Sequence, residues 1–103
     1  MKQIIQKIIN TIVQTVSPQK IIFFGSRSIG NFRSDSDYDF MVIKKDVVNE
    51  REVSRKIYGA FFKNHIKQDV DIVVVSEAKL KSKKNNFYQI YSWALKEGKV
   101  VYG

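Results

Sequence analysis

Three short apolar runs are the feature that most limits how this chain can fold. They cover residues 20–24, 37–43 and 69–75, and they are rich in the β-branched and aromatic side chains that favour strands. None of them approaches the roughly 18 apolar residues that a membrane span needs. We therefore expect three buried strands.

Helical patterns lie before, between and after these runs. Residues 4–16 place their apolar side chains on one side of a helix, with polar residues at every position between them. A second helix is expected over residues 49–64, with an asparagine cap, and a third over residues 86–97, followed by a short edge strand at 99–102. The sequence thus predicts one α/β domain over residues 1–103: a small mixed β-sheet with helices packed on one side.

Composition narrows the chemistry that such a domain can perform. The chain has no cysteine and one histidine, His65, which excludes disulfides, thiolate zinc sites and a cysteine nucleophile. Its 18 Lys and Arg residues outnumber its 10 Asp and Glu residues, and the net charge of +8 favours an anionic partner. No signal peptide is recognisable, so we expect a cytoplasmic protein with no membrane partner.

Aspartates stand at the start of two predicted strands, where acidic residues are otherwise rare. Asp37 and Asp39 are two residues apart, so their side chains share one face of a strand, about 6.5 Å from each other along it. Such carboxylates suit Mg²⁺, which takes oxygen ligands from the protein and from substrate phosphates. Asp71 can add a third carboxylate from a neighbouring strand, and Asp69 competes for this role because both point to one face. Two Mg²⁺ ions held in this way would stabilise the attacking and leaving oxygens of phosphoryl transfer.

Gly25 and Ser26 directly follow the first predicted strand. Glycine allows a close approach of the backbone, and free N–H groups at the start of a short helix bind phosphate. The Ser26 hydroxyl adds a donor, and Arg27 can neutralise a phosphate oxygen. The segment is neither a P-loop nor a dinucleotide-binding fingerprint, because it lacks Gly-Lys-Ser/Thr and G-x-G-x-x-G. We therefore predict that these three residues bind a nucleotide.

The two elements together resemble the signature of a known family. Residues 24–40 (FGSRSIGNFRSDSDYDF) hold Gly-Ser, a ten-residue gap and Asp-x-Asp, and residues 70–75 (VDIVVV) hold a third acidic residue on a later strand. This pattern resembles the DNA polymerase β-like nucleotidyltransferase superfamily. The compact length and residues 94–102 (ALKEGKVVY) resemble its minimal nucleotidyltransferases (MNT), which are encoded beside HEPN proteins.

The resemblance implies a fold, a reaction and a partner. By this likeness Gly25 and Ser26 bind the triphosphate of ATP, while Asp37, Asp39 and Asp71 bind Mg²⁺ and support catalysis. An acceptor hydroxyl would attack the α-phosphate, and Mg²⁺-pyrophosphate would leave. The MNT likeness implies that the acceptor is a tyrosine of a HEPN toxin, which would receive AMP and lose its activity. The chain would then be the antitoxin of a toxin–antitoxin pair.

Two other functions stay open. The acceptor could be a small molecule of the antibiotic type, with the site closed by a homodimer, or the chain could be a non-catalytic module that masks a partner. The intact set of carboxylates argues against the last. Some aromatic side chains fall off the predicted helix faces and favour a protein interface, in a homo- or hetero-oligomer: Tyr58, Phe62, Tyr88 and Trp93. The lysine-rich stretch at 79–84 favours a solvated face, with contact to an acidic partner or to RNA as the alternative; direct nucleic-acid binding is the less favoured of these.

Overall fold

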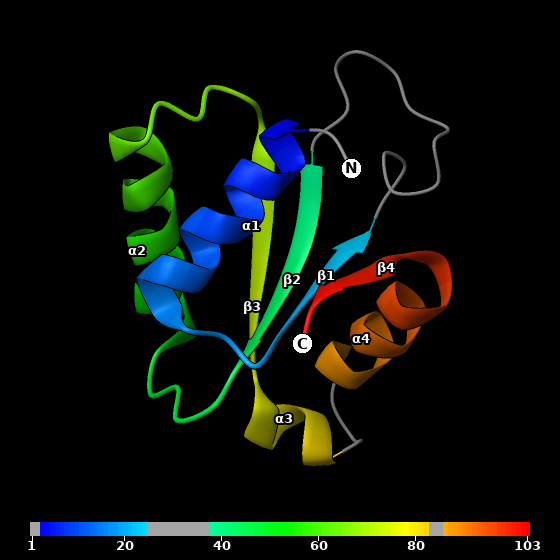
Figure 1. Ribbon diagram of the computed structural model, residues 1–103. Coiled ribbons are helices and arrows are strands. Elements are labelled where there is room, and N and C mark those ends of the chain that lie inside the picture. Colours follow the sequence, from blue (N-terminus) through cyan, green and yellow to red (C-terminus); the bar gives the residue numbers. More distant parts are fainter. Residues whose placement is uncertain (1–2, 25–37, 83–85) are drawn as a thin grey trace.

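The computed structural model describes residues 3–24, 38–82 and 86–103. Its elements, in chain order, are α1 (Gln3–Val16), β1 (Lys20–Phe24), β2 (Tyr38–Lys44), α2 (Glu50–Lys63), β3 (Val70–Ser76), α3 (Glu77–Ser82), α4 (Asn86–Glu97) and β4 (Lys99–Tyr102). The three apolar runs form β1, β2 and β3, and β4 is the predicted short edge strand (Figure 1). In the described part of the chain, no helix has the length and apolar character to cross a membrane.

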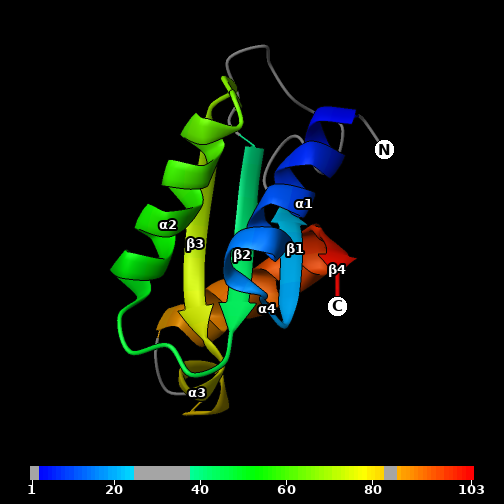
Figure 2. The ribbon, with the colours of Figure 1, turned by 60° about the vertical axis from the view of Figure 1, so that its left-hand side comes forward.

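The four strands form one mixed sheet in the order β3-β2-β1-β4. β1 is antiparallel to both of its neighbours, β2 and β4, whereas β2 and β3 are parallel. Parallel strands need a crossover connection, and α2 provides it. The predicted α/β class and the mixed sheet are therefore confirmed. Figure 2 shows the sheet with α1 and α2 in front of it and α4 behind.

Helices cover both faces of this sheet, which corrects the expectation that they pack on one side. On one face, α1 and α2 enclose a core that includes Phe40 and Val74. On the other face, Ala94 of α4 packs in a second cluster with Ile22 and Met41. The physical reason lies in the strands themselves. Side chains alternate between the two faces of a sheet, so an unbroken apolar run presents apolar groups on both, and both must be covered.

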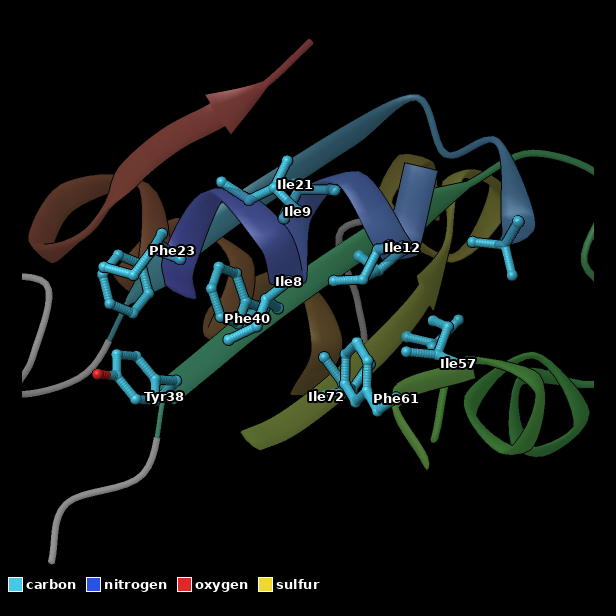
Figure 3. Packing of buried hydrophobic residues seen from close by; sticks show 14 residues of the cluster. Ile8, Ile9, Ile12, Ile21, Phe23, Tyr38, Phe40, Ile57, Phe61 and Ile72 are labelled. Carbon is cyan, nitrogen blue, oxygen red and sulfur yellow. The ribbon is translucent and has the colours of Figure 1, made fainter. Parts of the chain in front are cut away.

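The apolar stripe of α1 forms the larger core, as predicted. Ile8 and Ile12 are fully buried, and they pack with Phe40 of β2 and Ile57 of α2 (Figure 3). Phe23 stacks on Phe40 with ring centroids 4.8 Å apart. This burial is the main source of stability for α1, because isolated helices of 14 residues are marginal in water.

α2 begins at the predicted asparagine cap. The Asn49 Oδ1 accepts hydrogen bonds from the N–H groups of Arg51 and Glu52, at 3.0 and 3.3 Å. These bonds satisfy two of the backbone donors that have no partner within a helix. Ile57 and Phe61, four residues apart on one face of the helix, are buried.

Gly59 lies in the middle of α2, and a Cβ placed there would meet no atom within 4 Å. Glycine inside a helix costs about 1 kcal/mol relative to alanine. We therefore expect Gly59→Ala to raise the free energy of unfolding by about 0.5–1 kcal/mol, and the Tm by several degrees, roughly 4–8 °C per kcal/mol for a domain of this size. Thermal unfolding followed by circular dichroism measures this, and a lower Tm would contradict the open surroundings of the residue.

Candidate active site

Asp39 and Asp71 lie side by side on β2 and β3. The parallel register places each directly beside the other, and neighbouring strands are about 4.8 Å apart. Asp39 shares its face of the sheet with Met41, and Asp71 shares it with Val73, which is the face that α4 covers. Asp39 is half-buried, whereas Asp71 is exposed. Two carboxylates are thus brought together at the beginning of two parallel strands.

Tyr38 determines the face to which Asp39 points. Its side chain is only 7% exposed and packs into the core on the α1 and α2 side, where its ring centroid is 6.2 Å from that of Phe23 (Figure 3). Its backbone N–H donates to the Asp69 carbonyl oxygen at 2.9 Å, which ties the start of β2 to the segment before β3. Because side chains alternate along a strand, the burial of Tyr38 on one face directs Asp39 to the other.

β1 ends beside Asp39, on the side away from Asp71. Phe24, its last residue, is directly opposite Asp39 in the antiparallel pairing of β1 with β2. Phe24, Asp39 and Asp71 therefore form one row across three strands, on one face of the sheet. Phe24 immediately precedes the glycine-serine segment in the chain. The remaining predicted site residues lie outside the described residues, and their roles stay predictions: Gly25, Ser26, Arg27 and Asp37.

The chemistry of the described donors suits a hard divalent cation. Asp39 and Asp71 offer only carboxylate oxygens, which are the ligands that Mg²⁺ takes, usually one or two of them together with substrate phosphates. Within the described ranges, no three His, Asp or Glu side chains come together in a way that could hold a metal ion. The third predicted ligand, Asp37, precedes the described start of β2. The pair therefore fits part of a Mg²⁺ site that substrate oxygens would complete.

The strand register also bears on the choice between Asp71 and Asp69. Asp71 lies within β3 and is the residue opposite Asp39. Asp69 precedes the strand, its side chain is exposed, and its backbone carbonyl accepts the hydrogen bond from Tyr38. This arrangement supports Asp71 as the partner of Asp39.

An aromatic pair flanks the carboxylates, and sequence reasoning identified only half of it. Trp93 of α4 is 49% exposed and meets Phe24 edge-on, with ring centroids 5.6 Å apart. The sequence predicts Trp93 at a protein interface. It places Phe24 in a strand and at the start of the signature over residues 24–40, but assigns it no role of its own; its position directly before Gly25 is the available signal. Tyr58 and Phe62 are also exposed, but they lie on α2, across the sheet from Trp93. The side chain of Tyr88 lies outside the described part of the chain, and the exposed aromatics that the structure describes do not form one patch.

Comparison with known proteins agrees with this arrangement. The chain matches the family described as polymerase beta, nucleotidyltransferase, over residues 6–103. No curated protein shows a significant match.

Similar solved structures share the fold. A toxin–antitoxin structure with AMP-PNP is 25% identical with a TM-score of 0.63, and the match covers 95% of this chain and 72% of that one. A mutant of the MntA-HpeT toxin–antitoxin, with two aspartates changed to glutamate, is 21% identical with the same TM-score and the same coverage. A nucleotidyltransferase structure from Sulfolobus solfataricus is 20% identical with a TM-score of 0.58, over 80% of this chain and 72% of that one. From the family match over residues 6–103, together with the fold and the paired aspartates, the chain belongs to the polymerase beta nucleotidyltransferase family.

Proposed function

We propose that this chain transfers the AMP part of ATP to a hydroxyl group, using Mg²⁺ held by Asp37, Asp39 and Asp71. The observation that carries the proposal is the register of β2 and β3, which sets Asp39 beside Asp71 next to the end of β1. Membership of a nucleotidyltransferase family supports the reaction class. The similarity to a toxin–antitoxin structure with AMP-PNP supports an adenine nucleotide as the donor.

Each part of the site has a proposed task. Mg²⁺, when bound, would neutralise the triphosphate and stabilise the attacking and leaving oxygens. Gly25, Ser26 and Arg27 would bind the phosphates. Asp71 is exposed, so it can accept the proton of an incoming hydroxyl. The hydroxyl oxygen forms a bond to the α-phosphorus, the bond from this phosphorus to the bridging oxygen breaks, and pyrophosphate leaves.

Asp71→Asn should lower the rate of transfer by at least about 100-fold, because it removes a direct metal ligand. Loss of a group that only hydrogen-bonds such a ligand already costs 10- to 100-fold in metal affinity or activity. Asp69→Asn is the matched control: it makes the same chemical change two residues away, outside β3. Steady-state rates at saturating ATP and Mg²⁺ compare the two. The reverse order of effects would assign the third carboxylate to Asp69.

For the acceptor, we propose a tyrosine of a HEPN-type toxin, with which this chain would form a hetero-oligomer and act as antitoxin. The toxin–antitoxin structures align with 95% of the chain, which supports this class of partner. The net charge of +8 favours an acidic partner surface, and the encounter should then slow as salt is added. AMP on a tyrosine adds bulk and negative charge, which is a direct way to inactivate the toxin.

Co-expression with the protein encoded next to it, followed by intact mass measurement, tests the acceptor. The expected result is a partner that gains one or more AMP units with the wild-type chain and none with Asp39→Asn. Absence of both complex and mass gain would contradict the toxin partner. Transfer to an aminoglycoside-type compound instead would favour the antibiotic-modifying alternative.

A further inference from the structure

Ile72, near the start of β3, donates a hydrogen bond to a group outside the sheet. β3 is at one edge of the described sheet, with β2 on its inner side. The Ile72 N–H donates to the hydroxyl oxygen of Tyr58, on α2, at 3.0 Å. Ile72 directly follows Asp71, and only Val70 precedes them within the strand. The bond therefore holds the backbone at the end of β3 that carries the candidate carboxylate.

We infer that Tyr58 is a positioning residue for Asp71, an inference that rests on the proposed function. Asp71 is exposed, so core packing does little to fix its side chain, and its position depends on the backbone that carries it. On the inner side, the parallel pairing with β2 sets Asp71 beside Asp39. At Ile72, the residue after Asp71, the hydrogen bond to the Tyr58 hydroxyl anchors the strand to α2. The strand is thus held from two directions at the point where it presents its carboxylate.

Tyr58 can serve as an anchor because its own ring is held. The ring meets Phe61 edge-on, with centroids 6.1 Å apart and an interplanar angle of 86°. Phe61 is 5% exposed and belongs to the larger core, together with Ile57 and Ile72. Tyr58 is 42% exposed as a residue, yet its hydroxyl oxygen accepts the hydrogen bond from the Ile72 N–H of the strand. An anchored aromatic side chain with few rotatable bonds loses little entropy in making this bond.

The consequence concerns metal binding more than folding. Groups that hydrogen-bond a metal ligand directly typically contribute 10- to 100-fold in metal affinity or activity. Tyr58 acts one residue away, through the Ile72 backbone, so its effect should lie at the lower end of this range. Tyr58→Phe removes one oxygen and leaves the ring to contact Phe61. We expect it to lower the transfer rate roughly 10-fold at a fixed, subsaturating Mg²⁺ concentration and to raise the Mg²⁺ concentration for half-maximal rate by a similar factor. Saturating Mg²⁺ should restore most of the rate.

Tyr102→Phe is the matched control, because it makes the same change in a partly exposed tyrosine on β4, at the opposite edge of the sheet. Both variants are compared with the wild type at a temperature where circular dichroism shows all three to be folded. Three quantities are measured: the Mg²⁺ dependence of transfer, Mn²⁺ binding by paramagnetic resonance, and the hydrogen exchange of the Ile72 amide. The expected result is a weaker affinity for both metals and a faster Ile72 exchange in Tyr58→Phe alone.

Two results would overturn the inference. One is an unchanged metal dependence with faster Ile72 exchange, which would make the hydroxyl purely structural. The other is an equal effect of Tyr102→Phe, which would mean that the loss is not specific to β3. If the wild type transfers no nucleotide at all, the proposed function fails. Mn²⁺ binding then still decides whether Tyr58 positions Asp71.

Discussion

Asp39→Asn is expected to lower nucleotidyl transfer by at least about 100-fold and to leave the fold intact, since it deletes a direct metal ligand. Asp39 is central to the proposed site, because it is the residue of β2 that lies opposite both Phe24 and Asp71. Asparagine has nearly the same shape, so the packing of Tyr38 and Phe40 on the other face should persist. Its neutral amide, however, is a poor ligand for Mg²⁺ beside a triphosphate. Asp37→Asn is expected to have the same effect.

Asp46→Asn provides the control for this prediction. Asp46 is exposed, follows β2 and has a φ of 57°, a conformation that asparagine also adopts readily. The same change of charge is thus made beyond the opposite end of β2, away from the row of carboxylates. Rates of transfer and thermal unfolding are measured for both variants. Near wild-type turnover in Asp39→Asn would refute the metal assignment, and equal losses in both would show a general effect of charge.

Gly98→Ala is expected to destabilise the protein by about 3 kcal/mol, at the upper end for an overpacked site. Gly98 ends α4, where its N–H donates to the Ala94 carbonyl at 2.8 Å. A Cβ there would lie 2.5 Å from the Phe23 carbonyl oxygen and 2.9 Å from the Phe24 Cβ. These groups belong to β1, so α4 and the strand would have to move apart. Because Phe24 is opposite Asp39, the displacement should also reduce activity.

Denaturant unfolding measures the free energy of unfolding of Gly98→Ala, and Gly59→Ala is the matched comparison. Both variants add one methyl group to a glycine. The surroundings of Gly98 are closed and those of Gly59 are open, so the two changes in free energy should have opposite signs. Wild-type stability of Gly98→Ala would contradict the close approach of α4 to β1.

Much of the fold could be predicted because its patterns are local. The α1 stripe has a helical period, and its predicted inward residues Ile8 and Ile12 are fully buried. The Asn49 cap has a recognisable residue type and spacing. The unbroken apolar run from Phe40 to Ile43 also carries a signal that both faces of the sheet are covered. A run without polar alternation indicates a strand buried on both sides.

α3 shows how a weaker local signal was missed. Its sequence is rich in lysine and favours a solvated face, so no helix was predicted there. Ser76 nevertheless caps it: its Oγ accepts from the Lys79 N–H at 3.3 Å, as a serine before a helix typically does. The helix is also tied to α2 by an ion pair of Lys79 with Glu50 at 2.7 Å. This contact joins residues far apart in the chain, which no local pattern predicts.

For the site, sequence reasoning supplied the residue types but not the register. The spacing of Asp37 and Asp39 predicts a shared strand face, and the structure adds that Asp71, rather than Asp69, is the direct neighbour of Asp39. Strand order and register depend on contacts between distant segments, so the residues alone left Asp69 as a competitor, and the choice of Asp71 followed from the family resemblance. The hydrogen bond from Ile72 to Tyr58 could not be predicted from a local pattern either, because it joins an edge strand to a helix.

The most direct test of the account is transfer from ATP labelled either on its α-phosphate or on its γ-phosphate. Wild-type chain, Mg²⁺ and the co-expressed partner are incubated with each, and the protein-bound label is measured. The account predicts that the α-label appears on the partner, that the γ-label does not, and that Asp39→Asn and Asp71→Asn transfer neither. Incorporation of the γ-label would show phosphoryl rather than nucleotidyl transfer, and α-label transfer that survives both substitutions would contradict the proposed site.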